Sequence, residues 1–441
     1  MFLSSVPMNI WLLKIGEPVP VDAGCKERLH RTGLLMNYLA EGGHRVTWWT
    51  STFDRIRRES VCDRDLTVSL KERVRIKLLH SPGYKKSVSL ARVRDQRHVA
   101  RKFTACAGGE NPPDLILSAY PTVELCKSAI VYGNRHRIPV VLDMRDMWPD
   151  IFLDSIPKAV RPFARFLMYP MLRDSRYVCT RATAITGITD EFVDWGLNRG
   201  NRERTPLDRS FPMAYITKPP LKDEIGEAER FWDKLGISRA KADFVVCFIG
   251  TIGHQFDLAT VLRAARKIRE TGRNVTFVIC GSGDRLELFK GMASGDDRVL
   301  FPGWVDAARM YVLLRRSSVG LNPIPDRYDF LSTINNKAVE YLSAGLPVLS
   351  SPKKGVLHRL LEAEKCGTCY EPGDQPGLSR AIIGLYDDPG GLKAWSENAK
   401  QVFERRFDAE IVYREMSRYL VDIASRFPGR NQVSGEIRRR V

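Results

Sequence analysis

Hydrophobic positions along the chain follow two alternating patterns, namely short continuous apolar runs and longer stretches in which apolar residues recur every three or four positions. The first pattern is typical of buried strands and the second of amphipathic helices. Residues 28–41 show the second pattern and end at Gly42 and Gly43, a typical helix stop. In the first half, apolar runs predict strands at 8–16, 44–51, 113–121, 138–146 and 182–188.

The same alternation returns in the second half, after a charged and proline-rich stretch at about 200–240 that indicates a connector. Strands that alternate with helices are typical of parallel sheets covered by helices. We therefore predict an α/β fold of two Rossmann-like domains, at 8–205 and 206–410, that face one another across a cleft. A C-terminal helix and basic tail at 411–441 could cross back over the domain junction. The predicted strands of the second half are 243–253, 275–283, 298–305, 319–324 and 347–351.

The loops after the predicted strands are candidate sites, because ligands of open α/β sheets bind at the carboxyl ends of the strands. In the second half, three of these loops begin with glycine, which lets the backbone approach a ligand, and the helix that follows offers N–H groups to an anion. A single such loop is equally an ordinary strand-to-helix turn. The candidate ligand-binding residues of these loops are Gly250, Thr251, Gly253, His254, Gly281, Gly283, Gly303 and Trp304.

A short apolar helix is predicted over about 335–344, ended by Gly345. Lys337 and Glu340 are three residues apart and therefore share a face near its positive end. A lysine there can neutralise a phosphate, and a carboxylate one turn on can accept hydrogen bonds from two ribose hydroxyls. Together they would bind the ribose and diphosphate of a sugar nucleotide, whereas the alternative is an ordinary Lys–Glu pair on a solvated face. The neighbouring polar candidates are Asn335 and Asn336.

Charged residues also follow the strands of the first half. A carboxylate at Asp146, at the end of the predicted strand 138–146, could orient an acceptor hydroxyl or take its proton. Alternatively, Asp146 and Arg145 pair structurally. The arginines near the start of helix 28–41 are either contacts for an acceptor or a phosphate, or solvated helix residues. The candidate acceptor-binding residues are Gly16, Glu17, Arg28, Arg31, Arg145 and Asp146.

The chain is strongly basic, with 69 lysines and arginines against 52 aspartates and glutamates and a formal net charge of +17. Such an excess favours a polyanionic partner, which could be a phosphate-bearing substrate, an anionic membrane surface or nucleic acid. Residues 158–178 interleave basic and apolar side chains, a pattern typical of an interfacial membrane helix, although a plain packed helix is the alternative. We expect no nucleic-acid partner, because no recognised nucleic-acid motif occurs.

Simple features argue against other classes of protein. The longest apolar runs are far shorter than the roughly 20 residues of a membrane-spanning helix, and the first residues lack the basic start of a signal peptide, so we expect neither. Nine scattered cysteines suit a reducing cytoplasm. Cys366 and Cys369 form the one C-x-x-C pair, and without a second pair we interpret them as packing residues. No histidine spacing is typical of a metal site, so we expect no metal and no other cofactor.

The stretch NKAVEYLSAGLPVLSS at 336–351 resembles the donor-site helix of glycosyltransferase family 4, retaining enzymes with the GT-B architecture. DFVVCFIGTIG, VTFVICGSGD and CGTCYEPGD look like the C-terminal domain of that family in order and spacing, and the resemblance spans nearly the whole chain. RDMWPD and ATAITGITDEFVDWG are similar to the N-terminal domain of its bacterial surface-polysaccharide branch. The resemblance implies an acceptor domain at 8–205 and a nucleotide-sugar donor domain at 206–410.

The resemblance also implies roles for single residues. Glu340 matches the second glutamate of the family's E-x7-E motif and is expected to bind the nucleotide ribose. The first glutamate would stand eight residues earlier, where this chain has Ser332. Many relatives place an arginine and a lysine after Gly253, which this chain lacks at 254–257. Lys337 is therefore the expected leading cation for the diphosphate.

The implied reaction is metal-independent, retaining transfer of a sugar from a UDP- or GDP-sugar, with Asp146, Lys337 and Glu340 as the predicted catalytic residues. The expected acceptor is lipid-linked or a saccharide, in O-antigen or capsule biosynthesis. The expected location is the cytoplasm, peripheral on the inner face of the cell membrane. Two rivals stay open: a GT-B sugar-nucleotide 2-epimerase, which needs no acceptor, and a non-enzymatic basic module that binds nucleic acid or membrane.

Overall fold

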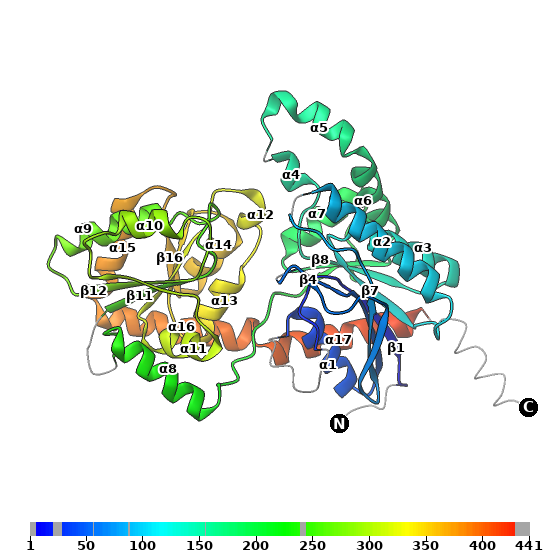
Figure 1. Ribbon diagram of the computed structural model, residues 1–441, viewed down its shortest axis with the longest axis horizontal. Helices are drawn as coiled ribbons and strands as arrows, with labels where there is room; N and C mark the ends of the chain where they lie inside the picture. Colours follow the sequence, from blue (N-terminus) through cyan, green and yellow to red (C-terminus); the bar gives the residue numbers. More distant parts are fainter. Residues whose placement is uncertain are drawn as a thin grey trace, which may run out of the picture. The chain divides into compact units, whose positions relative to one another are not determined.

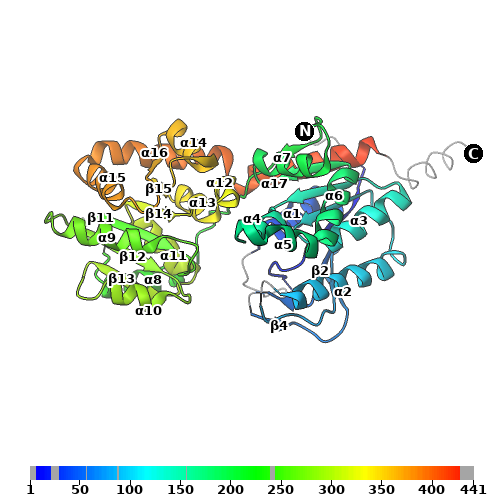
Figure 2. The same cartoon turned by 90° about the horizontal axis from the view of Figure 1, so that it is seen from above.

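The computed structural model describes residues 6–20, 29–55, 57–86, 89–154, 156–238 and 244–427. The chain folds into two compact units, one formed by Met1–Pro212 with Val412–Val441 and the other by Met213–Ile411. Each unit is a largely parallel sheet covered by helices (Figures 1 and 2). The predicted α/β fold of two Rossmann-like units is thereby confirmed.

The first unit is built on an eight-stranded sheet of order β10-β9-β8-β7-β1-β2-β6-β5. Neighbouring strands are parallel except β5, which is antiparallel to β6. The sequence interpretation missed both β5, the edge strand, and its neighbour β6, because a half-exposed alternating pattern is a weaker signal than a buried apolar run. The strands are β1 (Asn9–Leu13), β2 (Arg45–Ser51), β5 (Leu66–Lys71), β6 (Val74–Leu79), β7 (Leu115–Tyr120), β8 (Val140–Met144), β9 (Ala184–Gly187) and β10 (Arg209–Ser210), beside a small hairpin of β3 (Phe53–Asp54) and β4 (Glu59–Ser60).

The helices of the first unit connect these parallel strands. The helix predicted at 28–41 is α1, which begins at Arg31 and is followed by Gly42 and Gly43 as expected. The helices are α1 (Arg31–Glu41), α2 (Leu90–Ala107), α3 (Val123–His136), α4 (Asp150–Asp154), the 3-10 turn η1 (Lys158–Val160), α5 (Arg161–Leu167), α6 (Tyr169–Arg181), α7 (Asp190–Gly200) and α17 (Ala409–Arg426).

The second unit is a six-stranded parallel sheet of order β13-β12-β11-β14-β15-β16. Its strands are β11 (Phe244–Ile249), β12 (Val275–Cys280), β13 (Val299–Gly303), β14 (Val319–Pro323), β15 (Val348–Ser351) and β16 (Gly367–Cys369). The helices are α8 (Lys222–Lys234), α9 (Leu258–Arg269), α10 (Leu286–Met292), α11 (Ala307–Arg316), α12 (Tyr328–Leu331), α13 (Asn336–Ser343), α14 (Gly355–Glu364), α15 (Gln375–Asp387) and α16 (Pro389–Arg406). All five strands predicted for this half are present.

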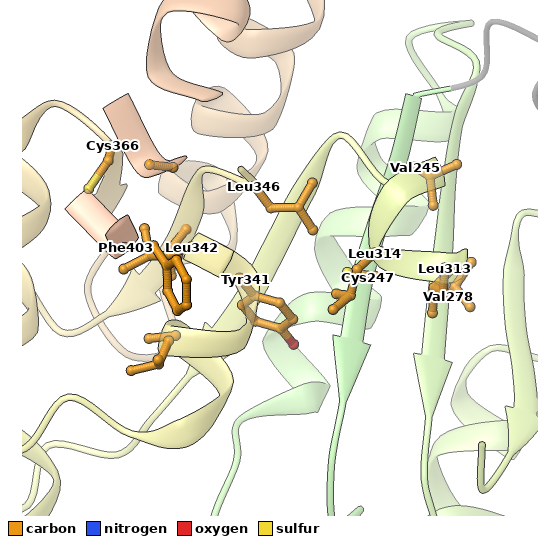
Figure 3. Close-up of a cluster of buried hydrophobic side chains, with 14 of the residues drawn as sticks. Val245, Cys247, Val278, Leu313, Leu314, Tyr341, Leu342, Leu346, Cys366 and Phe403 are labelled. Carbon is orange, nitrogen blue, oxygen red and sulfur yellow. The ribbon is translucent and has the colours of Figure 1, made fainter. Parts of the chain in front are cut away.

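One face of the second sheet is covered by a core that α11, α13 and α16 complete (Figure 3). Tyr341 of α13 and Phe403 of α16 are almost fully buried in it. Cys366 and Cys369 are also buried, and neither forms a disulfide, as their interpretation as packing residues predicts. The core fixes α13, the helix that carries the predicted donor-site residues, against the sheet.

Part of the stretch interpreted as a connector, 200–240, belongs to the second unit. It forms α8, whose Trp232 is 0% exposed and packs into the core that α13 shares. The indole N–H of Trp232 donates a hydrogen bond to the carbonyl of Arg309 at 2.8 Å. Much of the high charge of this stretch lies on the outer face of an amphipathic helix. Its composition is therefore similar to that of a linker, although the segment is folded.

The two units exchange chain at Pro212 and again at Val412. The predicted boundary at 205/206 lies a few residues before the observed one. The residues up to Pro212 stay with the first unit because Asp208 accepts hydrogen bonds from Arg202 and from the Ile185 N–H. The predicted C-terminal helix, α17, packs most of its length on the first unit, where Tyr413 is fully buried. The chain thus returns to the unit from which it started.

The basic segment 158–178 forms η1, α5 and α6. On α5, Phe163, Phe166 and Leu167 are 63%, 76% and 63% exposed, so this helix presents apolar side chains to the surroundings instead of to a core. Within the residues that the structure describes, no helix combines the length and the apolar character needed to cross a bilayer.

Candidate active site

Three glycine loops meet at the carboxyl edge of the second sheet, where β11, β12 and β13 lie side by side. Gly281 and Gly303 have φ angles of 139° and 82°, in the range that favours glycine. A Cβ added to Gly281 would lie 1.8 Å from the carbonyl oxygen of Gly250, so only glycine allows the two loops to approach. Close packing of backbone on backbone explains the glycine at position 281, whereas at Gly303 the positive φ favours glycine.

Backbone hydrogen bonds hold the three loops together. The Gly281 N–H donates to the Gly303 carbonyl at 2.8 Å, and the Ile252 N–H donates to the Ser282 carbonyl at 2.9 Å. A pocket of about 230 Å³ opens at this edge, beside the indole of Trp304, which is 71% exposed. The lining residues are Ile249, Gly250, Thr251, Gly281, Ser282, Trp304 and Val305.

Lys337 reaches the same edge from α13. The strand order reverses between β11 and β14, and open α/β sheets bind ligands at such a reversal. The Lys337 ammonium lies 4.0 Å from the ring centre of Phe256, and a Cβ added to Gly250 would come within 2.5 Å of it. No hydrogen bond or ion pair joins this ammonium to another described residue. Burial lowers the Lys337 pKa to about 8, against the opposing field of Glu340.

The position of α13 is fixed by its neighbours. The Ile249 N–H donates to the Tyr341 hydroxyl at 3.1 Å, and Gly320 leaves the space that the Tyr341 ring fills. Asn335 caps the helix by accepting a first-turn N–H at 3.1 Å, and its amide donates to the Asn322 side chain at 2.8 Å. Asn335 was predicted to contact the donor, but its side chain holds the helix start in place.

The first and second glycine loops also interlock through their side chains. A Cβ added to Gly283 would lie 2.1 Å from the Ile252 carbonyl oxygen, so this predicted glycine too serves a close approach. His254, with a side chain 70% exposed, accepts a hydrogen bond from Arg285 Nε at 3.1 Å. Arg285 was missed, although its place directly after the GSGD loop could have marked it. Gly253 lies next to this pair, and a Cβ added to it would lie 3.2 Å from the Asp284 carboxylate.

The remaining predicted donor-site residues lie around Lys337. Glu340 is half-buried one helical turn further on. Asn336 is exposed at the first position of α13. Ser332, which stands where relatives have a glutamate, is only 2% exposed and ends α12.

A buried ionic network lies at the carboxyl edge of the first sheet. Arg31, the first residue of α1, donates to both carboxylate oxygens of Asp143 at 2.9 and 3.0 Å, and both side chains are 0% exposed. Arg145 donates to Asp143 at 2.6 Å and pairs with Glu17. Burial raises the pKa of Asp143, but the fields of Arg31 and Arg145 outweigh this and hold it well below its usual range.

This network assigns a different role to two predicted acceptor contacts. Arg31 is committed to Asp143 and to the Pro212 carbonyl, and Glu17 accepts from both the backbone N–H and the hydroxyl of Thr32. Both side chains hold the fold together, and the structure gives neither a surface for an acceptor. Arg28 lies outside the described residues.

A second pocket, of about 250 Å³, lies at this edge of the first unit. Of the predicted acceptor residues, Gly16, Arg145 and Asp146 line it. The sequence analysis did not predict the other cations of this pocket, Lys14, Arg55 and Arg92. Of these, only Lys14 had a local signal, since it stands at the end of a predicted apolar strand. The lining residues are Lys14, Ile15, Gly16, Ser51, Phe53, Arg55, Tyr84, Arg92, Asp95, Gln96, Pro121, Thr122, Arg145, Asp146 and Trp148. Among all described residues, no three His, Cys, Asp or Glu side chains come together as a possible metal site.

Both units match families of known proteins. Residues 30–207 match the glycosyl transferase 4-like domain, and residues 243–388 match the glycosyl transferases group 1 family. Together with the two parallel sheets and the glycine loops, these matches identify the chain as a glycosyltransferase with the GT-B fold.

Three similar proteins illustrate the range of this class. A 2-deoxystreptamine glucosyltransferase from Streptomyces kanamyceticus is 24% identical over 171 residues, which are 38% of this chain and only 42% of that protein. The structure of HepE from Anabaena with UDP-glucose has a TM-score of 0.64 and 16% identity, over 94% of this chain and 100% of its own. WaaG, a glycosyltransferase involved in lipopolysaccharide biosynthesis, has a TM-score of 0.62 and 15% identity, over 94% and 99% of the two chains.

Proposed function

We propose that the protein is a retaining glycosyltransferase that moves a sugar from a UDP- or GDP-sugar to a lipid-linked or saccharide acceptor in bacterial surface-polysaccharide biosynthesis. The observation that carries the proposal is the half-buried Lys337 ammonium, which lies over the Gly250 loop at the strand reversal without an ion-pair partner among the described residues. Two proteins of similar fold support it, since HepE binds UDP-glucose and WaaG acts in lipopolysaccharide biosynthesis.

The donor is bound by one cation, backbone N–H groups and an aromatic ring. Lys337 pairs with the diphosphate, and the loop that contains Thr251 and Gly253 supplies N–H donors to it. The half-buried carboxylate of Glu340 accepts hydrogen bonds from the ribose hydroxyls. Trp304 offers the nucleobase a flat, exposed surface beside the pocket.

The transfer forms one bond and breaks one bond at the anomeric carbon of the donor sugar. The acceptor hydroxyl attacks the face from which the diphosphate leaves, and the departing diphosphate takes the hydroxyl proton. Lys337 and the loop N–H groups neutralise the charge that develops on the diphosphate, so the reaction proceeds without a metal. Asp146, which lines the pocket of the first unit, orients the acceptor hydroxyl.

The proposed acceptor is presented at an anionic membrane surface on the cytoplasmic side. α5 exposes Phe163, Phe166 and Leu167 and carries Arg161 and Arg165 on the same short helix. Exposed rings next to cations are typical of a helix that lies in the interface of an anionic bilayer. Exposed apolar side chains grouped on one element mark contacts with a membrane or with another protein, and the neighbouring cations favour an anionic membrane.

Binding to nucleotide-sugars tests the donor site. A panel of UDP- and GDP-sugars should include one that raises the thermal unfolding temperature of the wild type, because a ligand that binds the folded state stabilises it. Lys337→Met should weaken that ligand by about 10- to 100-fold, while Lys393→Met, an exposed position on α16, should not. Equal affinity in wild type and Lys337→Met would overturn the proposed donor site.

The reaction itself is tested by its products. Incubation of the matching nucleotide-sugar with lipid-linked and saccharide acceptors should give a glycoside that keeps the anomeric configuration of the donor, as proton NMR can show. Turnover of the nucleotide-sugar alone, with an epimerised product, would instead identify a 2-epimerase. Loss of transfer in EDTA, with recovery on addition of manganese, would contradict the metal-independent mechanism.

A further inference from the structure

We infer that the pocket of the first unit binds a phosphate or diphosphate group of the acceptor. The identity of the ligand as an acceptor rests on the proposed function, but binding of an anion to this pocket can be tested without any sugar transfer. Lys14, Arg55, Arg92 and Arg145 line this pocket, whereas Asp95 and Asp146 are its two carboxylates. The four lining cations outnumber the two lining carboxylates, and Arg145 is also paired with carboxylates behind the wall, Glu17 and Asp143.

The cations of the pocket are not fully balanced by the protein. Lys14 directly follows β1, and the indole N–H of Trp48 donates a hydrogen bond to its backbone carbonyl at 2.9 Å. No hydrogen bond or ion pair connects its ammonium to any described residue. Arg145 is bonded to Glu17 and Asp143 through two of its nitrogens, but its Nη2 is buried and lacks a hydrogen-bond partner.

A buried ammonium and a buried guanidinium nitrogen without partners are costly, because each has lost water and gained nothing in return. Burial lowers the pKa of Lys14, and the field of Arg145 adds to this, so that the pKa falls to about 8. An anion that contacted both groups would relieve this cost. The two residues line one pocket, so a single tetrahedral phosphate could accept from both.

The other two cations are held against flat or open surfaces. The Arg92 guanidinium lies 4.0 Å from the ring centre of Trp148 and 5.7 Å from that of Tyr84. The Arg55 side chain runs over Gly16, where a Cβ would lie 3.7 Å from its Cδ atom. Stacked arginines lose little freedom when they form a fork of hydrogen bonds, which is the geometry that phosphate oxygens accept.

The size and walls of the pocket limit what it can hold. A volume of about 250 Å³ is at the lower end of ligand pockets and suits a head group more than a complete acceptor. Phe53, Tyr84 and Trp148 add ring surface to its walls. The geometry therefore fits a charged phosphate with a short apolar or sugar portion attached, in either a lipid diphosphate or a soluble sugar phosphate.

Direct binding tests the anion site. Titrations use the full chain with Lys337→Met as background, so that the donor site does not compete for phosphate. Inorganic pyrophosphate should bind, and addition of either Lys14→Met or Arg92→Gln should weaken it by about tenfold or more. Arg94→Gln is the matched control, because Arg94 is an exposed residue of the same helix, α2, and outside the pocket. Equal pyrophosphate affinity in all these variants would overturn the inference.

Further ligands identify the source of the phosphate. Tighter binding of farnesyl diphosphate than of pyrophosphate supports the site with a lipid head group, and tighter binding of glucose 6-phosphate supports it with a soluble acceptor. Sodium glucuronate that binds as tightly as pyrophosphate would overturn the assignment to phosphate. Thermal unfolding of each variant shows whether it folds, and a misfolded Lys14→Met is replaced by the milder Lys14→Gln.

The donor site is measured separately in the same chain. Lys14→Met and Arg92→Gln in the wild-type background should leave nucleotide-sugar affinity unchanged, because both residues belong to the first unit. Pocket variants that lose pyrophosphate but keep nucleotide-sugar affinity support the inference. If the wild type binds no nucleotide-sugar but the pocket variants still lose pyrophosphate affinity, the proposed function is contradicted and the anion site is supported.

Discussion

The two candidate ligand pockets differ in the groups that offer positive charge. In the second unit, the site is mostly backbone, with three glycine loops and a single lysine at the strand reversal. In the first unit, one lysine and three arginines surround the pocket, and a buried salt network supports them. Backbone N–H groups keep their dipoles at every pH and need only the correct turn, whereas side-chain cations must be held by other charges.

This difference teaches what each site depends on. The backbone site depends on the absence of side chains, since a single methyl group would separate its loops. The side-chain site depends on pairs, since Arg145 is aimed by Glu17 and Asp143, and Asp143 in turn by Arg31. Mutations that add atoms should therefore damage the backbone site of the second unit, and mutations that remove atoms should damage the side-chain site of the first unit.

The largest effect is expected from the salt network of the first unit. Arg31→Met leaves the buried Asp143 with the Thr186 hydroxyl and with Arg145 in place of two bonded cations, and we expect a loss of about 3–5 kcal/mol of unfolding free energy. Urea unfolding measures it, and Arg45→Met, at an exposed site on β2, should change it by less than about 0.5 kcal/mol. Because the Asp143 pKa lies below its usual range, its stabilisation is present at neutral pH and is lost as the pH falls. A neutral effect of Arg31→Met at pH 7 would show that the network supports nothing.

Gly281→Ala tests whether the donor pocket depends on missing side chains. The added methyl would meet the Gly250 carbonyl at 1.8 Å with φ at 139°, so we expect a cost of about 3 kcal/mol and loss of nucleotide-sugar binding. Calorimetric titration and thermal unfolding measure the two effects. Gly291→Ala on α10, where nothing lies within 4 Å of the added Cβ, is the matched control and should bind as the wild type does. Tight binding by Gly281→Ala would refute the backbone account.

The single lysine of the backbone site should give donor binding a pH dependence. With a pKa of about 8 in the free protein, Lys337 carries its charge below this pH and loses it above. Nucleotide-sugar affinity should therefore fall by about tenfold as the pH rises from 7 to 9, measured by titration in buffers of constant ionic strength. The profile of Lys337→Met should be flatter, and an equally steep decline in that variant would assign the dependence to another group.

The smallest effect is a gain of stability from Lys14→Met. Burial, with Arg145, lowers the Lys14 pKa from near 10.5 to about 8, so the folded state at pH 7 holds a charge that the unfolded chain solvates better. Removing it should stabilise the fold by about 1 kcal/mol after allowance for screening, as urea unfolding measures. The gain should shrink between pH 8 and 10.5, where the folded-state lysine is already neutral.

Lys71→Met, at an exposed strand end, is the control for that comparison and should be neutral. A destabilised Lys14→Met would mean that the ammonium is better solvated in the pocket than its lack of protein partners indicates.

The parts of the molecule that sequence reasoning predicted are those with a local signal. The apolar runs gave the central strands, and glycine at three strand ends located the backbone pocket, because turn chemistry is written in consecutive residues. Lys337 and Glu340 were predicted from the same kind of local spacing, and their role in donor binding stays a prediction. Both pocket edges needed only the rule that ligands bind at the carboxyl ends of parallel strands.

What could not be predicted depends on residues far apart in the chain. Arg31 and Asp143 are 112 positions apart, and an arginine at a helix start looks the same whether water or a carboxylate faces it. The cations Lys14, Arg55 and Arg92 come from three separate segments, so no window of sequence contains the pocket. The capping role of Asn335 was not predicted, since a capping amide and a ligand-binding amide share one sequence pattern.

The chain leaves the first unit after Pro212 and re-enters it at Val412, so the second unit is inserted into the first along the sequence. Tyr215 and Asp408 form a bridge, with the Tyr215 N–H bonded to the Phe407 carbonyl at 3.0 Å and the Ala409 N–H bonded to the Tyr215 carbonyl at 3.2 Å. The beginning and end of residues 213–411 thus meet at one point, which is the topology of an inserted domain. Residues 213–411 therefore form a cassette whose two ends lie together. If this unit binds the sugar nucleotide, as we propose, its replacement by the corresponding unit of another member of this class is expected to change the sugar nucleotide and to leave every strand of the first sheet intact.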